Sequence, residues 1–326
     1  MTKILILGSN SFSGSNLCNF LINKNFTIIG CSLSAQPQKK FNVMSEKMKE
    51  KFFFYKIDIN KNFHALQKII LKHKPEIIID FLGQGMVAES WQYPSLTFNT
   101  NVIGKIKLYE FLKNRNFLKK YIKISTPEVF GSSKITSANF NKYNPSTPYA
   151  LSHSTIEIYL QLMRKQFLFP VIILRFANFY GPYQKLYRLI PLAIHKASNK
   201  KKFKLHGSGL SKRSFIYSDD FCNAIFKVIK NGKIGAFYQF SSKEYLSIKK
   251  IVEIIYKKKN LDPKKYIINV KDRAGKDKNY KIIDNDTRNR LNWKNTITFD
   301  KGINEVIKWY DKYKNKFVKK DEKFNI

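Results

Sequence analysis

Two short segments of the chain carry side chains that can move protons. The first, Ser125-Thr-Pro-Glu128, ends an apolar run and contributes two hydroxyls and a carboxylate. The second begins at Tyr149 and carries His153 four residues later, so both rings share one face of a predicted helix. Taken singly, Glu128 also fits a surface carboxylate at a strand end, and Tyr149 an ordinary aromatic at a helix N-terminus. Side chains of these types are candidates for acid–base catalysis.

A glycine-bounded turn near the N-terminus has the features of a phosphate site. Gly8-Ser-Asn-Ser-Phe-Ser-Gly14 follows an apolar run and precedes a helical pattern, where a dinucleotide-binding loop must sit. The free N–H groups of a helix start attract a pyrophosphate. Ser11 stands where a middle glycine is expected, so an ordinary strand–turn–helix explains the motif as well. The predicted dinucleotide contacts in this turn are Gly8, Asn10, Ser11, Phe12, Ser13 and Gly14.

The elements that must position these segments alternate along the first 180 residues. Continuous apolar runs, typical of strands buried on both faces, alternate with helix-length segments. They predict an α/β fold with a Rossmann-type, doubly wound parallel sheet over residues 1–180. Residues 181–326 are predicted to form a smaller α+β substrate domain, with segment 215–240 returning to the first. The predicted strands are Lys3–Leu7, Thr27–Leu33, Phe52–Ile57, Glu76–Leu82, Lys119–Ser125 and Val171–Phe176; the predicted helices are Gly14–Asn23, Phe63–His73, Ser95–Asn114 and Pro148–Gln166.

Six motifs resemble the extended short-chain dehydrogenase/reductase family, and most closely its nucleotide-sugar 4,6-dehydratases. The resemblance covers nearly the whole chain, and the motifs lie at 8–14, 125–131, 145–153, 175–182, 206–217 and 272–277. It implies bound NAD and a nucleoside-diphosphate hexose, of the dTDP-glucose or GDP-mannose type, as substrate. The implied product is a 4-keto-6-deoxy sugar, formed by transient oxidation at C4, loss of water and return of hydride to C6.

The same resemblance implies catalytic roles. Tyr149 would remove the proton of the sugar 4-hydroxyl, and Thr126 would hydrogen-bond that hydroxyl. Glu128 would take the C5 proton and, since Pro127 supplies no second acid, would also protonate the departing C6 hydroxyl. The family lowers the pKa of its tyrosine, ordinarily about 10, with a lysine four residues later and with the positive ring of the cofactor. Here that residue is His153, which is positive only when protonated.

NAD is the implied cofactor, with NADP as the alternative. Cys31-Ser32 stands where an acidic residue usually holds the adenine ribose, and Lys39 and Lys40 could accept a 2′-phosphate instead. Asp58 could accept a hydrogen bond from the adenine amino group or cap a helix. Beyond the opening turn, the implied cofactor contacts are Ser32, Asp58, Ile59, Leu82, Gly83, Gln84, Ser125, Tyr149 and His153.

Arginine is rare in this chain, which makes two arginines informative. Only eight of the 60 basic residues are arginine, and Arg213 and Arg273 fall in motifs that bind the substrate diphosphate in the family. The planar guanidinium suits bidentate phosphate contact, whereas a surface ion pair is the alternative for each. Thr126, Glu128, Asn178 and Tyr187 complete the implied substrate contacts. Family habit implies a homodimer through Ser95–Asn114 and Pro148–Gln166, and no histidine spacing indicates a metal.

The net charge of +37 suggests at first a nucleic-acid partner. Lysine is spread along the whole chain, however, alongside abundant isoleucine and asparagine, which favours compositional drift over a nucleic-acid site. The 43% hydrophobic content excludes a disordered polyelectrolyte. No apolar run approaches a membrane span, no leader pattern opens the chain, and three scattered cysteines form no disulfide framework. A cytoplasmic location is therefore expected.

Two other functions stay open at this point. One is decarboxylation or epimerisation of a UDP-sugar, because related decarboxylases also keep a glutamate at the position of Glu128. The other is a degenerate, non-catalytic binding member of the family, with RNA as its candidate partner. The departures at Ser11, Pro127 and His153 support this second alternative.

Overall fold

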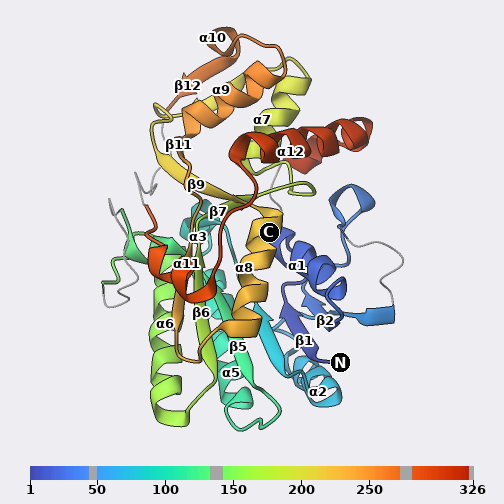
Figure 1. Cartoon of the computed structure of the whole chain (residues 1–326), viewed down its shortest axis with the longest axis vertical. Coiled ribbons are helices and arrows are strands. Elements are labelled where there is room, and N and C mark those ends of the chain that lie inside the picture. Colours follow the sequence, from blue (N-terminus) through green and yellow to red (C-terminus); the bar gives the residue numbers. More distant parts are fainter. Residues whose placement is uncertain (44–49, 133–141, 272–280, 323–326) are drawn as a thin grey trace.

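A seven-stranded parallel sheet forms the lower part of the molecule in Figure 1. The computed structural model describes residues 1–43, 50–132, 142–271 and 281–322. The strand order β10-β6-β5-β4-β1-β2-β3 is that of a Rossmann fold, which confirms the predicted fold class. The strands of this sheet are β1 (Lys3–Leu7), β2 (Thr27–Ser32), β3 (Phe52–Lys56), β4 (Ile77–Asp80), β5 (Lys120–Ser125), β6 (Val171–Phe176) and β10 (Phe237–Phe240).

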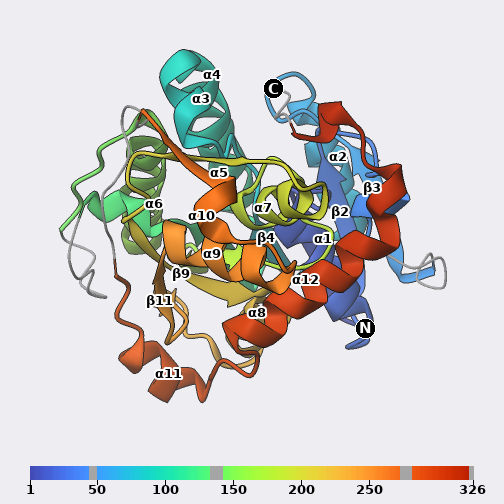
Figure 2. The same cartoon turned by 90° about the horizontal axis from the view of Figure 1, so that it is seen from above.

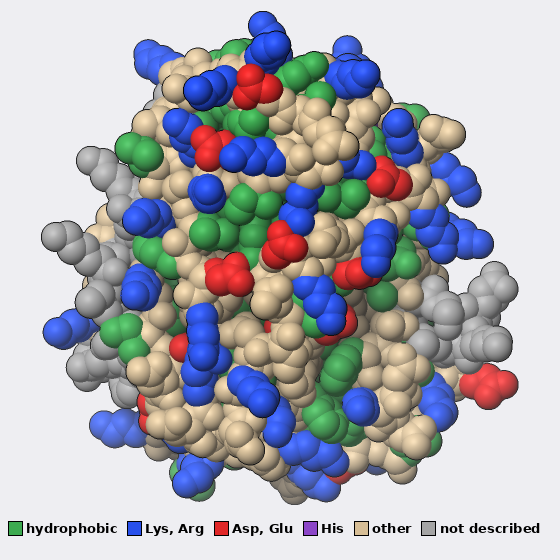
Figure 3. Space-filling model, turned by 45° about the horizontal axis from the view of Figure 1, so that its top comes forward, with side chains coloured by type: hydrophobic (Ala, Val, Ile, Leu, Met, Phe, Trp, Pro, Cys, Tyr) green, Lys and Arg blue, Asp and Glu red, His purple; other side chains and the backbone are tan. Residues whose placement is uncertain are grey.

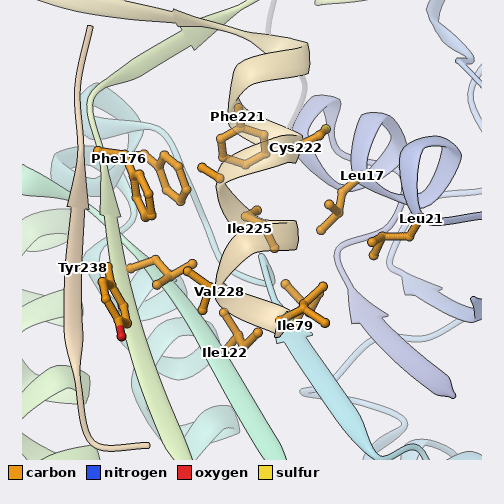
Figure 4. Close-up of a cluster of buried hydrophobic side chains, with 14 of the residues drawn as sticks. Leu17, Leu21, Ile79, Ile122, Phe176, Phe221, Cys222, Ile225, Val228 and Tyr238 are labelled. Atoms are coloured by element: carbon orange, nitrogen blue, oxygen red, sulfur yellow. The ribbon is translucent and has the colours of Figure 1, made fainter. Parts of the chain in front are cut away.

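Helices cover both faces of the sheet because its strands are apolar on both faces. Along β1, Ile4 and Ile6 pack towards α1 and α8, whereas Leu5 and Leu7 pack towards α2, α5 and α6. Figure 4 shows the first of these layers, with Leu17, Phe221 and Ile225 of the helices against the sheet. The covering helices are α1 (Phe12–Ile22), α8 (Ser218–Asn231), α2 (Phe63–His73), α5 (Gly104–Leu112) and α6 (Pro148–Phe167).

A smaller α+β layer lies above the carboxyl edge of the sheet (Figures 1 and 2). It has its own apolar core, built largely from α7, α9 and α12. Its strands are β7 (Asn178–Tyr180), β8 (Phe203–His206), β9 (Lys212–Tyr217), β11 (Tyr245–Ser247) and β12 (Ile267–Val270). The remaining helices are α3 (Val87–Gln92), α4 (Pro94–Phe98), α7 (Leu189–Ser198), α9 (Ile248–Lys258), α10 (Pro263–Tyr266), α11 (Asn285–Leu291) and α12 (Phe299–Tyr313).

Two segments depart from a simple two-part chain. The predicted helix Ser95–Asn114 is divided into α4 and α5 by a turn of π-helix at Asn99–Ile103. Within the segment 215–240, β9 belongs to the upper three-stranded sheet, α8 packs on α1, and β10 pairs with β6 at the edge of the lower sheet. The domain boundary at 180/181 stays a prediction.

Basic side chains are dispersed over the surface. On the face shown in Figure 3, lysine and arginine are interspersed with acidic, apolar and neutral side chains and form no single continuous stripe. Within the described ranges, none of the helices combines the length and apolar character needed to cross a bilayer.

Candidate active site

The loops that follow the strands of the parallel sheet bring the predicted site residues to one edge. Parallel strands end at the same edge, and ligands of such sheets bind outside their carboxyl ends. Gly8 follows β1, Ser32 ends β2, Gln84 lies beyond β4, and Ser125 ends β5. The structure therefore assembles residues from four separate parts of the sequence.

The opening turn has the backbone geometry of a phosphate-binding loop. Gly8 has a φ of +83°, which a residue with a side chain rarely adopts, and its N–H donates to the Cys31 carbonyl over 2.7 Å. A Cβ on Gly14 would lie 2.3 Å from the Gly8 carbonyl oxygen, so only glycine lets α1 approach β1 this closely. Ser11 is the N-cap of α1, and its hydroxyl accepts from Gly14 N at 3.0 Å. This cap explains a serine at position 11.

The end of β2 holds the opening turn in place. The Ser32 hydroxyl accepts from Asn10 N at 3.0 Å, and the Asn10 side chain donates to the Ser34 carbonyl at 2.8 Å. Lys39 is exposed, but Lys40 is buried and pairs with Asp321 at 2.6 Å, with Nζ also donating to the Lys316 carbonyl. Because Lys40 pairs with the C-terminal segment, only Lys39 of the two lysines considered could bind a 2′-phosphate.

Asp58 and Ile59 follow β3 in different environments. Asp58 is half-buried and accepts from Asn60 N at 2.8 Å, which closes a local turn. Helix α2 has Asn62 as its N-cap residue, so the alternative role of Asp58 as a helix cap is wrong. Ile59 is buried in the core between the sheet and its covering helices, which leaves only its backbone near the edge.

Asn101 fixes the loop after β4. Its side-chain oxygen accepts from Gln84 N at 2.7 Å, and its amide donates to the Gln84 carbonyl at 3.1 Å and to Ser152 Oγ at 3.0 Å. Gly83 leaves room for this amide, because a Cβ there would lie 2.8 Å from Asn101 Oδ1. Gln84 also has a buried Nε2 without a hydrogen-bond partner in the structure, and half-buried Leu82 precedes it.

The segment Ser125–Glu128 and the start of α6 lie side by side. Thr126 caps a short 3₁₀ helix, Pro127–Phe130, by accepting from Glu128 N at 3.2 Å, and Pro127 occupies its first turn. On α6, Tyr149 N donates to the hydroxyl of fully buried Ser90 at 3.2 Å. The Tyr149 and His153 ring centroids are 4.6 Å apart, edge to face.

His153 links this pair to the strand end. Its Nδ1 lies 3.4 Å from the Ser125 hydroxyl. Burial lowers the pKa of His153 well below its ordinary range, and the charges of Lys123 and Lys105 lower it further, whereas Asp80 acts in the opposite direction. His153 is therefore neutral at neutral pH.

The electrostatics around Tyr149 favour the neutral phenol. Burial raises the pKa of Tyr149 above its ordinary value, and the nearby Glu128 carboxylate raises it further. A hydrogen bond with Thr126 and the charge of Arg188 act in the opposite direction. These interactions place Tyr149, Thr126 and Glu128 in one site. A further positive charge is needed before Tyr149 can act as a base near neutral pH.

The predicted substrate residues lie on the side of the upper layer. Half-buried Asn178 begins β7, which pairs with β9, and Arg213 on β9 is buried, with Nη1 donating to the Lys212 carbonyl at 2.8 Å. Tyr187 is half-buried in the loop before α7, and the Arg188 guanidinium is 5.4 Å from its ring centroid. Arg273 lies outside the described residues.

A buried charge cluster beneath His153 was not predicted. Asp80, Lys105 and Lys123 are each at most 2% exposed, and Asp80 Oδ2 lies 2.5 Å from Lys105 Nζ and 3.5 Å from Lys123 Nζ. The sequence signals were present: Asp80 ends the apolar run Ile77–Ile79, and Lys123 interrupts an apolar strand. No group of three or more His, Cys, Asp or Glu side chains suited to a metal occurs in the described ranges.

Comparison with known proteins identifies the family. The family model described as GDP-mannose 4,6 dehydratase matches residues 5–306. The dTDP-D-glucose 4,6-dehydratase of Dictyostelium discoideum is 30% identical over 96% of this chain and 82% of its own length. The dTDP-glucose 4,6-dehydratase of Haemophilus influenzae is 26% identical, covering 95% of this chain and 98% of its own.

A solved structure agrees with these sequence matches. The dTDP-glucose 4,6-dehydratase of Bacillus anthracis, crystallised in complex with NAD, superposes with a TM-score of 0.86. It is 29% identical, and the match covers 97% of this chain and 98% of that one. The resemblance drawn from the six motifs is confirmed: the chain belongs to the GDP-mannose 4,6 dehydratase family, within the extended short-chain dehydrogenases/reductases.

Proposed function

We propose that this protein is an NAD-dependent nucleotide-sugar 4,6-dehydratase. It would convert a nucleoside-diphosphate hexose, of the dTDP-glucose or GDP-mannose type, to the 4-keto-6-deoxy sugar nucleotide used in deoxysugar synthesis. The observation that carries the proposal is the convergence of Tyr149, Thr126 and Glu128 at the carboxyl edge of a Rossmann sheet. A carboxylate at this place supplies the acid–base step that separates dehydration from simple oxidation.

The opening turn fits a dinucleotide. The positive φ of Gly8 and the close approach of α1 at Gly14 bring the N-terminus of α1 next to the end of β1, where its N–H groups would meet the pyrophosphate. Ser32, Asp58 and Gln84 would contact the rest of NAD, and Ser125, Tyr149 and His153 would line its nicotinamide end. When bound, NAD supplies a hydride acceptor for C4 of the sugar and a hydride donor for C6.

Tyr149, Thr126 and Glu128 would divide the proton transfers. Tyr149 removes the 4-hydroxyl proton, and Thr126 holds that hydroxyl by a hydrogen bond. Glu128 removes the C5 proton and gives a proton to the departing C6 hydroxyl, because buried Pro127 offers no acid beside it. Asn178, Tyr187, Arg213 and Arg273 would hold the substrate diphosphate and orient the sugar.

The test is incubation of purified protein, with NAD, with dTDP-glucose, GDP-mannose and UDP-glucose in turn. The expected product of one of them has lost one water, and deuterium placed at C4 of the substrate is recovered at C6. Release of carbon dioxide from UDP-glucuronate, or an epimer of unchanged mass, would support the alternative reactions instead. Absence of any product from NAD-loaded protein would disprove the dehydratase proposal.

We also propose a homodimer through α6 and the segment before α5. Leu151, Ile158 and Leu162 are 46%, 45% and 58% exposed and recur at helical spacing on one face of α6. Ile103 is 48% exposed at the end of the π-helical turn. A second copy presenting the same two helices would bury these side chains.

Sedimentation velocity of Leu162→Asp tests this dimer. The substitution is expected to give a monomer, because it places a charge in the apolar contact. Leu71→Asp is the matched control, since Leu71 is 43% exposed on α2, away from the proposed contact. A wild-type protein that sediments as a monomer, or a Leu162→Asp variant that stays dimeric, would refute the proposal.

A cytoplasmic location stays a prediction.

A further inference from the structure

The position that carries a lysine in the family carries a neutral imidazole here. His153 lies one helical turn after Tyr149, with its ring against the tyrosine ring and Nδ1 3.4 Å from Ser125 Oγ. Burial and two nearby lysines keep His153 unprotonated. Position 153 therefore supplies no positive charge to the Tyr149 phenol, which needs a nearby cation to serve as a base near neutrality.

Two lysines lie directly behind this imidazole. Lys123 on β5 and Lys105 on α5 line one small interior gap together with His153, and the other lining residues are Asn101, Ser152 and Ile156. Lys123 precedes Ser125 by two residues, so its side chain leaves β5 on the same face as the Ser125 hydroxyl. The charges of both lysines act on the His153 ring.

Asp80 needs only one of these two lysines as its close ion-pair partner. Asp80 Oδ2 is 2.5 Å from Lys105 Nζ, and Asp80 Oδ1 accepts from Leu82 N at 2.9 Å, so both carboxylate oxygens have close partners without Lys123. Lys123 Nζ stands 3.5 Å from the same Oδ2. Among the described residues, Asp80 is the acidic side chain paired with either lysine. Burial lowers the pKa of Lys105 to about 7, with Asp80 opposing the shift and the charge of Lys123 adding to it. The cluster holds one excess positive charge while both lysines are protonated.

Other charged and titratable groups also face the site. The Asp80 carboxylate also faces the buried phenols of Tyr109 and Tyr121, whose pKa values are raised by burial and by Asp80 itself. On the ligand side, Tyr149 faces Glu128, which opposes its ionisation, and the exposed Arg188, which favours it. The Asp80–Lys105–Lys123 cluster is the cationic group on the interior side.

We propose that Lys123, held with Lys105 on Asp80, provides from behind the neutral His153 ring a positive charge that assists Tyr149 in taking the substrate proton. Lys123 is thus a positioning residue. From strand β5, it takes the place of the lysine that the family carries at position 153 on α6. The role rests on the proposed function for Tyr149. The physical basis is that opposite charges in a buried, low-dielectric site attract strongly, which stabilises the phenolate.

The test is Lys123→Met in the full-length protein, with folding checked by thermal melting. The pH at which Tyr149 ionises, taken from ultraviolet difference titration against a Tyr149→Phe reference, is expected to rise by about one pH unit. With the sugar nucleotide that proves to be the substrate, kcat near neutral pH is expected to fall about tenfold and to recover as pH rises. KM should stay unchanged, because Lys123 does not reach the substrate.

Restoring activity with a second substitution distinguishes this role of Lys123 from a purely structural one. His153→Lys combined with Lys123→Met is expected to restore both the Tyr149 titration and kcat, because a lysine then stands one turn from Tyr149. Lys120→Met is the matched control on the same strand: its Nζ donates to the Ile229 carbonyl at 2.8 Å, away from His153. Lys120→Met should leave the titration and kcat as in wild type.

The outcomes that overturn the inference are distinct from failure of the proposed function. If Lys123→Met lowers kcat equally at every pH, leaves the Tyr149 titration unmoved and is not rescued, Lys123 is structural only. If it does not fold, Lys123→Gln replaces it, since that change also removes the positive charge of Lys123 but keeps a polar side chain. If wild type dehydrates no sugar nucleotide, the proposed function fails, while the Tyr149 titration still decides the role of Lys123.

Discussion

At the scale of single residues, Glu128 is expected to separate the two halves of the proposed reaction. Glu128→Gln removes the proposed base for the C5 proton but leaves Tyr149 and Thr126 in place. Product formation should fall by about 10²–10⁴-fold. The absorbance of reduced nicotinamide should still appear when substrate is mixed with the NAD-loaded variant, and stopped-flow absorbance with product analysis measures both.

Tyr149→Phe is the companion variant. It should abolish the nicotinamide signal as well as the product, since the 4-hydroxyl proton then has no acceptor. A Glu128→Gln protein that makes product at the wild-type rate would show that the water leaves without this carboxylate.

Gly14 makes a second prediction at this scale. In Gly14→Ala the new methyl would meet the Gly8 carbonyl oxygen at 2.3 Å, so α1 must move away from the opening turn. The Kd of NAD, measured by calorimetry, is expected to rise about tenfold or more. Asn19→Ala on the same helix adds no group near the turn and should keep wild-type affinity. An unchanged Kd in Gly14→Ala would mean that this loop does not bind the pyrophosphate.

At the scale of elements, a buried ion pair joins α6 to the sheet. Arg175 on β6 pairs with Glu157 on α6, both side chains are fully buried, and Tyr143 donates to Glu157 Oε2 at 2.9 Å. Glu157→Gln leaves the guanidinium without its counter-charge. The free energy of unfolding, from denaturant titration, is expected to fall by about 3–5 kcal/mol.

An exposed pair provides the comparison. Arg290 and Asp286 are one helical turn apart on α11, with Nη1 and Oδ2 at 3.0 Å and the side chains 35% and 58% exposed. Asp286→Asn should change the free energy of unfolding by about 1 kcal/mol or less. Equal losses in the two variants would contradict the view that burial makes the Arg175–Glu157 pair important.

The elements also show which features the sequence could predict. The strands Lys3–Leu7 and Val171–Phe176 occur at their predicted bounds, because burial on both faces leaves continuous apolar runs. The helix predicted for Ser95–Asn114 carries a π-helical turn that no hydrophobic period marks. The motifs of the candidate site indicated which loops converge at the sheet edge.

Contacts between charged residues far apart in sequence were beyond prediction. Lys40 looked available for a 2′-phosphate until its partner, Asp321, was seen in the fold. The Asp80–Lys105–Lys123 cluster joins two strands and a helix, and single lysines in apolar runs give no indication of a shared carboxylate. Such pairs depend on packing, which one sequence without its fold does not reveal.

At the scale of the whole molecule, the net charge of +37 should speed the arrival of an anionic substrate. Positive potential raises association rates, and salt screens it over roughly 10 Å at 0.1 M ionic strength. The ratio kcat/KM for the sugar nucleotide should therefore fall as sodium chloride is added, with kcat little changed. Steady-state kinetics over a salt series measures this; a kcat/KM independent of salt would contradict it.

The order of the strands has a consequence for how the protein is made. Strand β10 and helix α8 belong to the lower sheet and its covering layer, yet the chain reaches them only after building β7 to β9 above. On the ribosome, Phe176 and Leu174 stay without their cover of Phe221, Ile225 and Phe240 until synthesis has passed Phe240. Nascent chains of intermediate length therefore expose an apolar surface, which chaperones can bind and which promotes aggregation. Translation that stops early would therefore yield an aggregation-prone fragment and not a functional half of the protein.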